Sequence, residues 1–258
     1  MTIRIALQLY TLRQQAAADF PATLREVAAA GYEHVEFAGF GDMAVADLRN
    51  LIDDLGLRAV SAHVPFVRFD EDVQSVVAEL ETLGCRYAVA PSIPQDHRGL
   101  DSIPALCERF NRWGAACREA GLRFGYHNHN WELEPRDGST MLDWLAAGTD
   151  AALVHFQVDV YWALVSGADP AALIARLAGR APTLHAKELA SGAEPRDTTV
   201  GDGVTPWEDL LAAAATAGTE WCSVEQEDDP ANAYRDIRRS LGNLRRLLGE
   251  DLAPSASR

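Results

Sequence analysis

The sequence of 258 residues predicts an α/β fold, and more narrowly a single closed (β/α)8 barrel that occupies residues 1–250. Two observations lead to this prediction. Eight short runs rich in β-branched or aromatic residues recur about 31 residues apart, which is the length of one strand–loop–helix–loop unit. Between them the apolar residues change to a helical spacing, as in Leu106, Phe110, Trp113 and Cys117. Such alternation is typical of a parallel sheet, and eight units close a barrel.

The expected strands begin with IRIALQL near the N-terminus and end with EWCSVE; they span residues 3–9, 34–37, 57–63, 86–91, 122–127, 153–159, 182–187 and 220–225. Each strand after the first is preceded by a glycine that we expect to end a helix in the left-handed conformation: Gly31, Gly56, Gly84, Gly121, Gly148, Gly179 and Gly218. An open, doubly wound sheet would carry dinucleotide-type glycines after its first strand, where this chain reads QLYTLRQQ. A last helix is expected up to Leu248, and residues 251–258 are expected to be a frayed tail.

The composition narrows the range of partners and locations. A net charge of −15 and a pI near 4.8 disfavour binding to nucleic acid or to an acidic membrane surface. The four cysteines form no C-x-x-C pair, which is typical of a reduced compartment. No apolar run approaches the roughly 18 residues of a membrane span, and the N-terminus does not resemble a secretion signal. We therefore expect a cytoplasmic protein with no nucleic-acid and no membrane partner.

In a barrel of this kind the reacting groups lie at the C-terminal ends of the strands. The polar and aromatic residues expected there are Gln8, Tyr10, Glu36, His63, His127, Asn128, His129, Glu132, Asp159, Trp162, His185, Lys187, Glu225 and Glu227. Gathering carboxylates, imidazoles and an ammonium group in one concave mouth costs several kcal/mol per unpaired buried charge. A divalent cation would compensate. Asp159, His185 and Glu225, with a fourth ligand from the loop after the fifth strand, form a mixed oxygen and nitrogen set that suits Mn²⁺, Co²⁺, Fe²⁺ or Zn²⁺.

Other residues of the same types are interpreted structurally. His34, His97 and His155 are expected to be structural histidines, because none of them ends a predicted strand. The acidic run 227–229 is interpreted as solvated surface. For Asp159 the alternative to a metal ligand is the cap of a following helix turn. Trp162 either packs the rim of the barrel or stacks on a sugar ring.

Five motifs together resemble a known family: YHNHNWE at 126–132, VDVYW at 158–162, LHAKE at 184–188, VGDGVTPW at 200–207 and SVEQED at 223–228. In this order they are similar to the sugar phosphate isomerase/epimerase group of the xylose-isomerase-like TIM-barrel superfamily, in its YHNH type. The resemblance implies one divalent ion, Mn²⁺ first and Co²⁺, Fe²⁺, Zn²⁺ or Mg²⁺ as alternatives, held by Asp159, His185 and Glu225. Many relatives end the fifth strand with a glutamate ligand, whereas the nearest acid here is Glu132. We predict Glu132 as the fourth ligand, with His127 as the substitute.

The resemblance also implies a reaction. We expect a metal-dependent sugar isomerase or epimerase that removes a proton next to the carbonyl of a keto sugar or cyclitol, through an enediolate that the metal stabilises. Glu225 or Glu132 would be the base, and Lys187 would face the developing oxyanion. The alternative is a dehydratase or lyase of a keto-inositol or a 3-keto-sugar, in which a protonated His127 or His129 expels a β-hydroxyl.

The expected substrate contacts are Tyr10, His63, His129 and Trp162. No glycine-rich turn with a basic cluster is present to clamp a phosphate, so a small non-phosphorylated sugar or cyclitol is the expected partner. The sequence is also compatible with a homodimer. The alternatives from other classes are a non-catalytic sugar-binding barrel and an apurinic endonuclease, and the negative charge disfavours the second of these.

Overall fold

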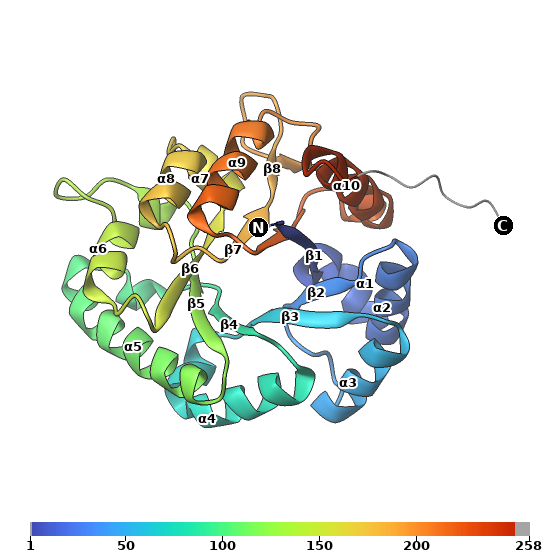
Figure 1. Ribbon diagram of the computed structural model, residues 1–258, viewed down its shortest axis with the longest axis horizontal. Coiled ribbons are helices and arrows are strands. Elements are labelled where there is room, and N and C mark those ends of the chain that lie inside the picture. The colour runs from blue at the N-terminus through green and yellow to red at the C-terminus, as the bar shows by residue number, and fades with distance from the viewer. Residues whose placement is uncertain (1, 251–258) are drawn as a thin grey trace.

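The computed structural model describes residues 2–250, so the predicted tail at 251–258 lies outside the described residues. Eight parallel strands form a closed barrel in the order β1-β10-β7-β6-β5-β4-β3-β2. Figure 1 shows these strands around the centre of the molecule, with the helices in an outer ring. The predicted (β/α)8 barrel is therefore confirmed.

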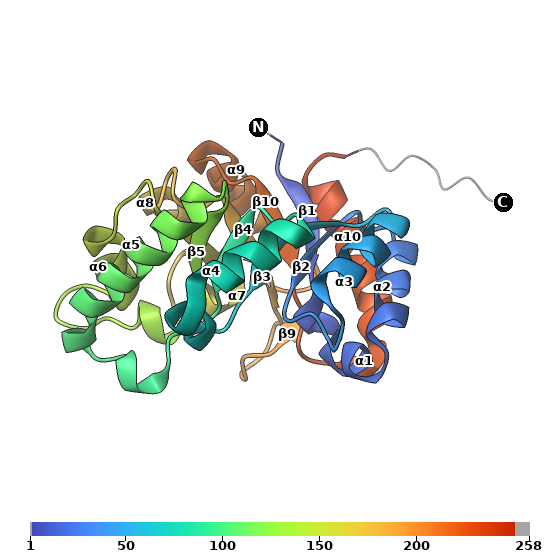
Figure 2. The same cartoon turned by 90° about the horizontal axis from the view of Figure 1, so that it is seen from below.

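Each barrel strand lies within one predicted segment, since the apolar runs are buried on both faces. The strands are β1 (Arg4–Gln8), β2 (His34–Phe37), β3 (Arg58–His63), β4 (Tyr87–Ala90), β5 (Arg123–His127), β6 (Val154–Asp159), β7 (Thr183–Ala186) and β10 (Trp221–Val224). A short antiparallel pair that we did not predict, β8 (Glu188–Leu189) and β9 (Asp197–Thr198), follows β7. In Figure 2, β1 starts at the upper end of the barrel and β9 lies at the lower end. The lower end is therefore the C-terminal mouth.

The helices cover the outside of the barrel. They are α1 (Arg13–Ala18), α2 (Phe20–Ala29), α3 (Val45–Asp54), α4 (Phe66–Leu83), α5 (Ile103–Glu119), α6 (Met141–Gly148), α7 (Val160–Val165), α8 (Pro170–Arg176), α9 (Trp207–Ala217) and α10 (Ala233–Leu247). Among residues 2–250, none of them combines the length and the apolar character needed to cross a bilayer.

Six of the seven predicted glycine helix ends have a positive φ, and Gly148 is the exception. Gly148 is the last residue of α6, and a Cβ added to it would lie 2.6 Å from the Sγ atom of Cys107. The prediction of a left-handed conformation at Gly148 was therefore wrong. Glycine is needed there for close packing of α6 against α5 instead.

A cluster of aromatic side chains packs between α4, α5 and β5. Trp113 is fully buried and stacks on Phe69 with ring centroids 5.2 Å apart. Phe110 and Phe124 lie 5.5 and 5.6 Å from the same indole ring. This cluster fixes α5 close to the barrel, where Gly114 meets the segment that leads into β6.

Two helical glycines allow a matched test of that packing. A Cβ on Gly114 would lie 2.5 Å from the carbonyl oxygen of Leu153, whereas a Cβ on Gly242 in α10 would meet nothing within 4 Å. We expect Gly114→Ala to destabilise the protein by about 1–3 kcal/mol, since the backbone must shift. Gly242→Ala should stabilise it by about 0.5–1 kcal/mol, because alanine is the better helix former. Urea denaturation of both variants measures the difference, and equal effects would contradict the packing described.

Candidate active site

Three acidic and imidazole side chains meet at the C-terminal mouth. Asp159 ends β6, His185 lies in β7, and Glu225 follows β10; all three are buried. Their potential ligand atoms lie within 4.8 Å of one another. The Nδ1 atom of His185 is 3.0 Å from Oε2 of Glu225 and 3.8 Å from Oδ2 of Asp159. The structure thus brings together the three residues that the sequence predicted as metal ligands on β6, β7 and β10.

The Asp159 carboxylate allows a test of whether a cation fits this cluster. Its Oδ1 accepts the backbone N–H of Trp162 at 2.9 Å and so caps α7. Its Oδ2 is buried and has no hydrogen-bond partner among residues 2–250. Burial raises the pKa of Asp159 to about 7, although Lys187 and His185 act to lower it. A cation beside Oδ2 would give this oxygen a partner and would stabilise the buried negative charge of the carboxylate. The donor set present therefore fits a divalent metal. Asp159 therefore caps a helix and also leaves one oxygen for a ligand.

A buried glutamate orients the histidine of this cluster. Oε1 of Glu36, on β2, lies 2.5 Å from Nε2 of His185. Burial by itself lowers the pKa of His185, but the adjacent carboxylates of Glu36 and Glu225 outweigh it and raise the pKa to about 10. Because Nε2 is occupied by Glu36, the Nδ1 atom faces Asp159 and Glu225. Carboxylates that hold a ligating histidine in this way are common behind metal sites.

Glu36 is in turn held by three further strands. Gln8 and Gln157 donate to its carboxylate at 2.6 and 2.7 Å, and the Ser61 hydroxyl donates as well. Burial raises the pKa of Glu36, but His185 and His63 outweigh it and lower the pKa to about 2. The sequence placed Glu36 at a strand end without giving it a role. Its signal was an acid between the apolar residues Val35 and Phe37 of a predicted strand, where burial needs a partner.

Glu132, which follows the fifth strand, does not lie where we expected a fourth metal ligand. Glu132 lies in a short 3-10 helix (Trp131–Leu133), where Tyr126 donates to one carboxylate oxygen and the backbone N–H of His129 donates to the other at 2.8 Å. Both oxygens are therefore engaged, and burial raises the pKa of Glu132 to about 7. The structure does not bring Glu132 to the cluster. The Nε2 atom of His127 lies 3.9 Å from Oδ2 of Asp159, so the substitute ligand is the nearer of the two.

A buried ammonium group completes the mouth. Lys187 donates to Glu227, and its Nζ atom lies 3.7 Å from a carboxylate oxygen of both Glu225 and Asp197. Burial lowers the pKa of Lys187, but the surrounding carboxylates, Glu225 first, outweigh it and raise the pKa above its usual value. The same Lys187 also offsets the effect of burial on Glu225, whose pKa is lowered, so Glu225 is ionised at neutral pH.

The interpretation of residues 227–229 as solvated surface holds for the exposed Asp229 and only in part for Glu227 and Asp228, whose side chains are 34% and 43% exposed. The Asp197 carboxylate accepts the backbone N–H groups of Glu227 and Asp228, each at 2.8 Å. The Asp228 carboxylate accepts the backbone N–H of Asp197 at 3.0 Å. These hydrogen bonds join β9 to the loop after β10. Asp197 had no predicted role. It ties the loop down and so sets the position of Glu227 against Lys187.

A cavity of about 410 Å³ opens beside these groups, a size suited to a small organic ligand. Its lining includes all four predicted substrate contacts and three of the expected polar groups: Tyr10, His63, His129, Trp162, His127, Glu225 and Glu227. Burial lowers the pKa of His129 to about 4 and that of His127 well below its usual value. Both imidazoles are neutral at pH 7, so neither is the protonated donor that the sequence suggested for a dehydratase.

The histidines predicted to be structural do not line this cavity. His34 packs against Trp221 at the start of the strands, with ring centroids 4.7 Å apart. His155 accepts a hydrogen bond from Arg123 at 3.0 Å. His97 lies beside Phe66 in the loop after β4.

Binding of Mn²⁺ to the described cluster is expected to release protons. At neutral pH the Nδ1 atom of His185 carries a proton, since the pKa of this residue is about 10, and the proton must leave before the nitrogen can hold a cation. Calorimetric titration in buffers of different ionisation enthalpy should give at least about one proton released per ion at pH 7, and a lower affinity as the pH falls. Binding without proton release would contradict this arrangement of His185.

A closed parallel barrel with a buried carboxylate and histidine cluster at its C-terminal mouth defines the class of this protein. The family model described as xylose isomerase-like TIM barrel matches residues 24–247, and the chain belongs to this family. The resemblance seen in the sequence is therefore confirmed.

Particular relatives narrow the class. The inosose dehydratase of Geobacillus kaustophilus is 26% identical in an alignment 251 residues long. The match covers 82% of this chain and 81% of the relative. A sugar phosphate isomerase/epimerase from Parabacteroides distasonis superposes with a TM-score of 0.80 at 27% identity, covering 95% of this chain and 94% of the other. D-psicose 3-epimerase from Clostridium cellulolyticum shares the fold, with a TM-score of 0.73 at 13% identity over 95% of this chain and 99% of the other. The neighbours are thus enzymes, among them both a dehydratase and epimerases.

Proposed function

We propose that this protein is a metal-dependent dehydratase or lyase of a small non-phosphorylated keto sugar or keto-cyclitol. The observation that carries the choice is the position of the carboxylates. Glu225 and Glu227 line the cavity from one strand end, whereas Glu132, on the other side, has both oxygens engaged by Tyr126 and His129. Epimerisation needs a second group that returns the proton on the opposite face, whereas an elimination on one face needs only one carboxylate. The dehydratase name of the Geobacillus relative supports the same choice.

The cation belongs to this proposal as well. Asp159, His185 and Glu225 would hold it, with His127 as the nearest side chain for a fourth position, and the mixed oxygen and nitrogen donors suit Mn²⁺. Such an ion supplies Lewis-acid polarisation of the substrate carbonyl, which makes the neighbouring C–H group acidic.

The chain's own residues then account for the elimination. Glu225, ionised beside Lys187, takes the proton from the carbon next to the carbonyl. It then gives this proton to the hydroxyl group on the following carbon, on the same face. The C–H and C–O bonds break, a C=C bond forms, and one water molecule leaves. The Lys187 ammonium, held by Glu227 and Asp197, balances the negative charge that develops on the substrate.

Isomerisation or epimerisation is the second candidate, and one observation favours it. The pKa of Glu132 is about 7, a value suited to proton exchange at neutral pH. The carboxyl group would have to turn from Tyr126 toward the cavity to return a proton there. It would then be the second base that an epimerase requires.

One experiment separates the two reactions. The protein is incubated with Mn²⁺ and a panel of inososes and keto sugars in deuterated water, and the products are followed by NMR and ultraviolet absorbance. A dehydratase gives an unsaturated ketone with loss of water, whereas an epimerase gives a deuterated epimer. If no ketone in the panel exchanges deuterium or loses water, both proposals fail.

A further inference from the structure

A second, larger cavity lies at the other end of the barrel from the candidate active site. It has a volume of about 520 Å³, and four arginines line it: Arg4, Arg49, Arg58 and Arg86. Arg4, Arg58 and Trp221 are the first residues of β1, β3 and β10, so the cavity surrounds the N-terminal ends of the strands. The arginines come from the first third of the chain, where β1 to β4 pair in sequence order, and closure of the barrel between β1 and β10 adds Trp221 to them.

The carboxylates nearby do not balance these guanidinium groups. Asp53 pairs with Arg49 at 2.8 Å. Glu220 is shared between Arg86 at 3.1 Å, Arg4 at 3.8 Å and a further arginine. The exposed Arg58 side chain has no ion pair or hydrogen bond within residues 2–250. A chain of net charge −15 thus concentrates unmatched positive charge in one cavity, and such a concentration attracts anions.

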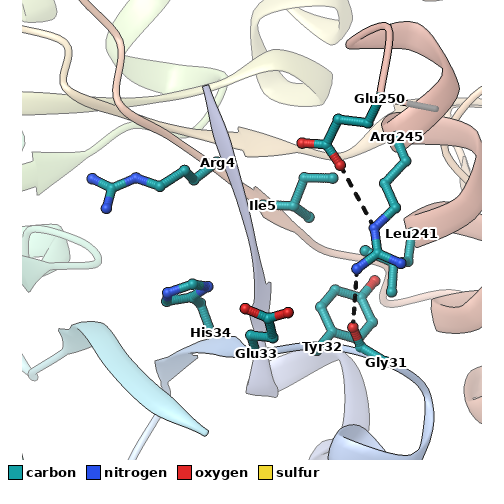
Figure 3. Close-up of a pocket in the computed structure, with 9 residues that line it drawn as sticks. All are labelled: Arg4, Ile5, Gly31, Tyr32, Glu33, His34, Leu241, Arg245 and Glu250. Carbon is teal, nitrogen blue, oxygen red and sulfur yellow. Dashed lines mark hydrogen bonds and ion pairs between the residues drawn. The ribbon is translucent and has the colours of Figure 1, made fainter. Parts of the chain in front are cut away.

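An adjoining cavity of about 270 Å³ provides the contrast (Figure 3). It shares Arg4 with the larger cavity. Its second arginine, Arg245, lies on the other side of β1. Arg245 pairs with Glu250 at 3.7 Å and donates to the carbonyl oxygen of Gly31 at 3.2 Å. Glu33 lines the same cavity. Its acids match its arginines, so the excess positive charge is confined to the side of β1 where Arg58 lies.

Trp221, the first residue of β10, is 4% exposed and lines the same cavity. The guanidinium carbon of Arg4 lies 3.8 Å from the centre of its indole ring, so the ring holds Arg4 at the wall of the cavity.

We propose that this cavity binds a small phosphorylated molecule with at least two negative charges. The planar guanidinium fork matches phosphate oxygens with two parallel hydrogen bonds, and Arg58 is free to make them. The volume suits a molecule rather than a single small ion. The site is separate from the mouth, so it does not depend on which reaction the enzyme performs.

Calorimetric titration with inorganic pyrophosphate at low ionic strength tests this site. We expect saturable binding of one pyrophosphate per chain, weakened at least tenfold in Arg58→Gln. Arg58→Gln should unfold at the wild-type temperature, since the Arg58 side chain has no partner to lose. The matched control is Arg25→Gln, which removes another exposed arginine without an ion pair in the described residues and should bind as the wild type does.

Pyrophosphate could also bind a cation held at the catalytic mouth, and the variant Asp159→Asn tests for this. If pyrophosphate binds in the arginine cavity, Asp159→Asn should bind it with the affinity of the wild type, even if the proposed reaction is wrong. The proposal is overturned if the wild type shows no saturable binding, if Arg25→Gln loses as much affinity as Arg58→Gln, or if binding disappears in Asp159→Asn.

Discussion

His185→Ala is expected to abolish both Mn²⁺ binding and turnover. The substitution removes the only proposed nitrogen ligand of the three-residue cluster, so the affinity should fall by more than the 10–100-fold seen when an outer partner of a metal ligand is lost. It also leaves Glu36 and Glu225 buried without the imidazolium that joins them. Loss of one partner from a buried ion pair costs about 3–5 kcal/mol, so a lower unfolding temperature should accompany the loss of metal.

Asp159→Asn separates the loss of metal from the loss of stability. An asparagine oxygen can still cap α7 at the backbone N–H of Trp162, but the charge at the unpartnered oxygen disappears. We expect this variant to stay folded and to lose Mn²⁺, as measured by metal analysis after gel filtration. His97→Ala, on the loop after β4, is the control that should change neither property. Retention of one Mn²⁺ per chain in both His185→Ala and Asp159→Asn would refute the proposed site.

Glu225→Gln is expected to lower kcat by at least about 10²–10⁴-fold, the range for loss of a positioned general base. Because the substitution also removes a proposed metal ligand, kcat is measured at saturating Mn²⁺ and beside the Mn²⁺ content of the variant. Glutamine keeps the size of the side chain and leaves Lys187 in contact with Glu227 and Asp197. Incorporation of deuterium from solvent into the substrate should stop together with turnover. The exposed Asp229, four residues further along the chain, provides the control Asp229→Asn, which should keep normal activity. Undiminished exchange in Glu225→Gln would assign the base to another residue.

The fold was predictable because its signal repeats along the chain. Each barrel strand coincides with an apolar run, and the runs are spaced by one βα unit. The same reasoning placed Asp159, His185 and Glu225 at strand ends that adjoin in the barrel, so their meeting follows from strand order. The short pair β8 and β9 was not predicted, because two-residue strands carry no detectable alternation.

The details of the site depend on contacts that no local pattern encodes. Whether Glu132 reaches the cluster is decided by the competing hydroxyl of Tyr126 and the N–H of His129. The surface-like run at Glu227 becomes part of the site only because Lys187 and Asp197 lie opposite it. The neutral state of His129 results from burial, which depends on packing by the whole barrel.

The hydrogen bonds that converge on Glu36 come from β1, β3, β6 and β7, and thus from the first and the third quarters of the sequence. The histidine of the proposed cation site is therefore oriented only after the ring of strands has closed. A half-barrel fragment would offer the same ligands without that orientation. Metal loading would then report completed assembly of the polypeptide, and added Mn²⁺ would shift the equilibrium toward the fully formed ring by mass action.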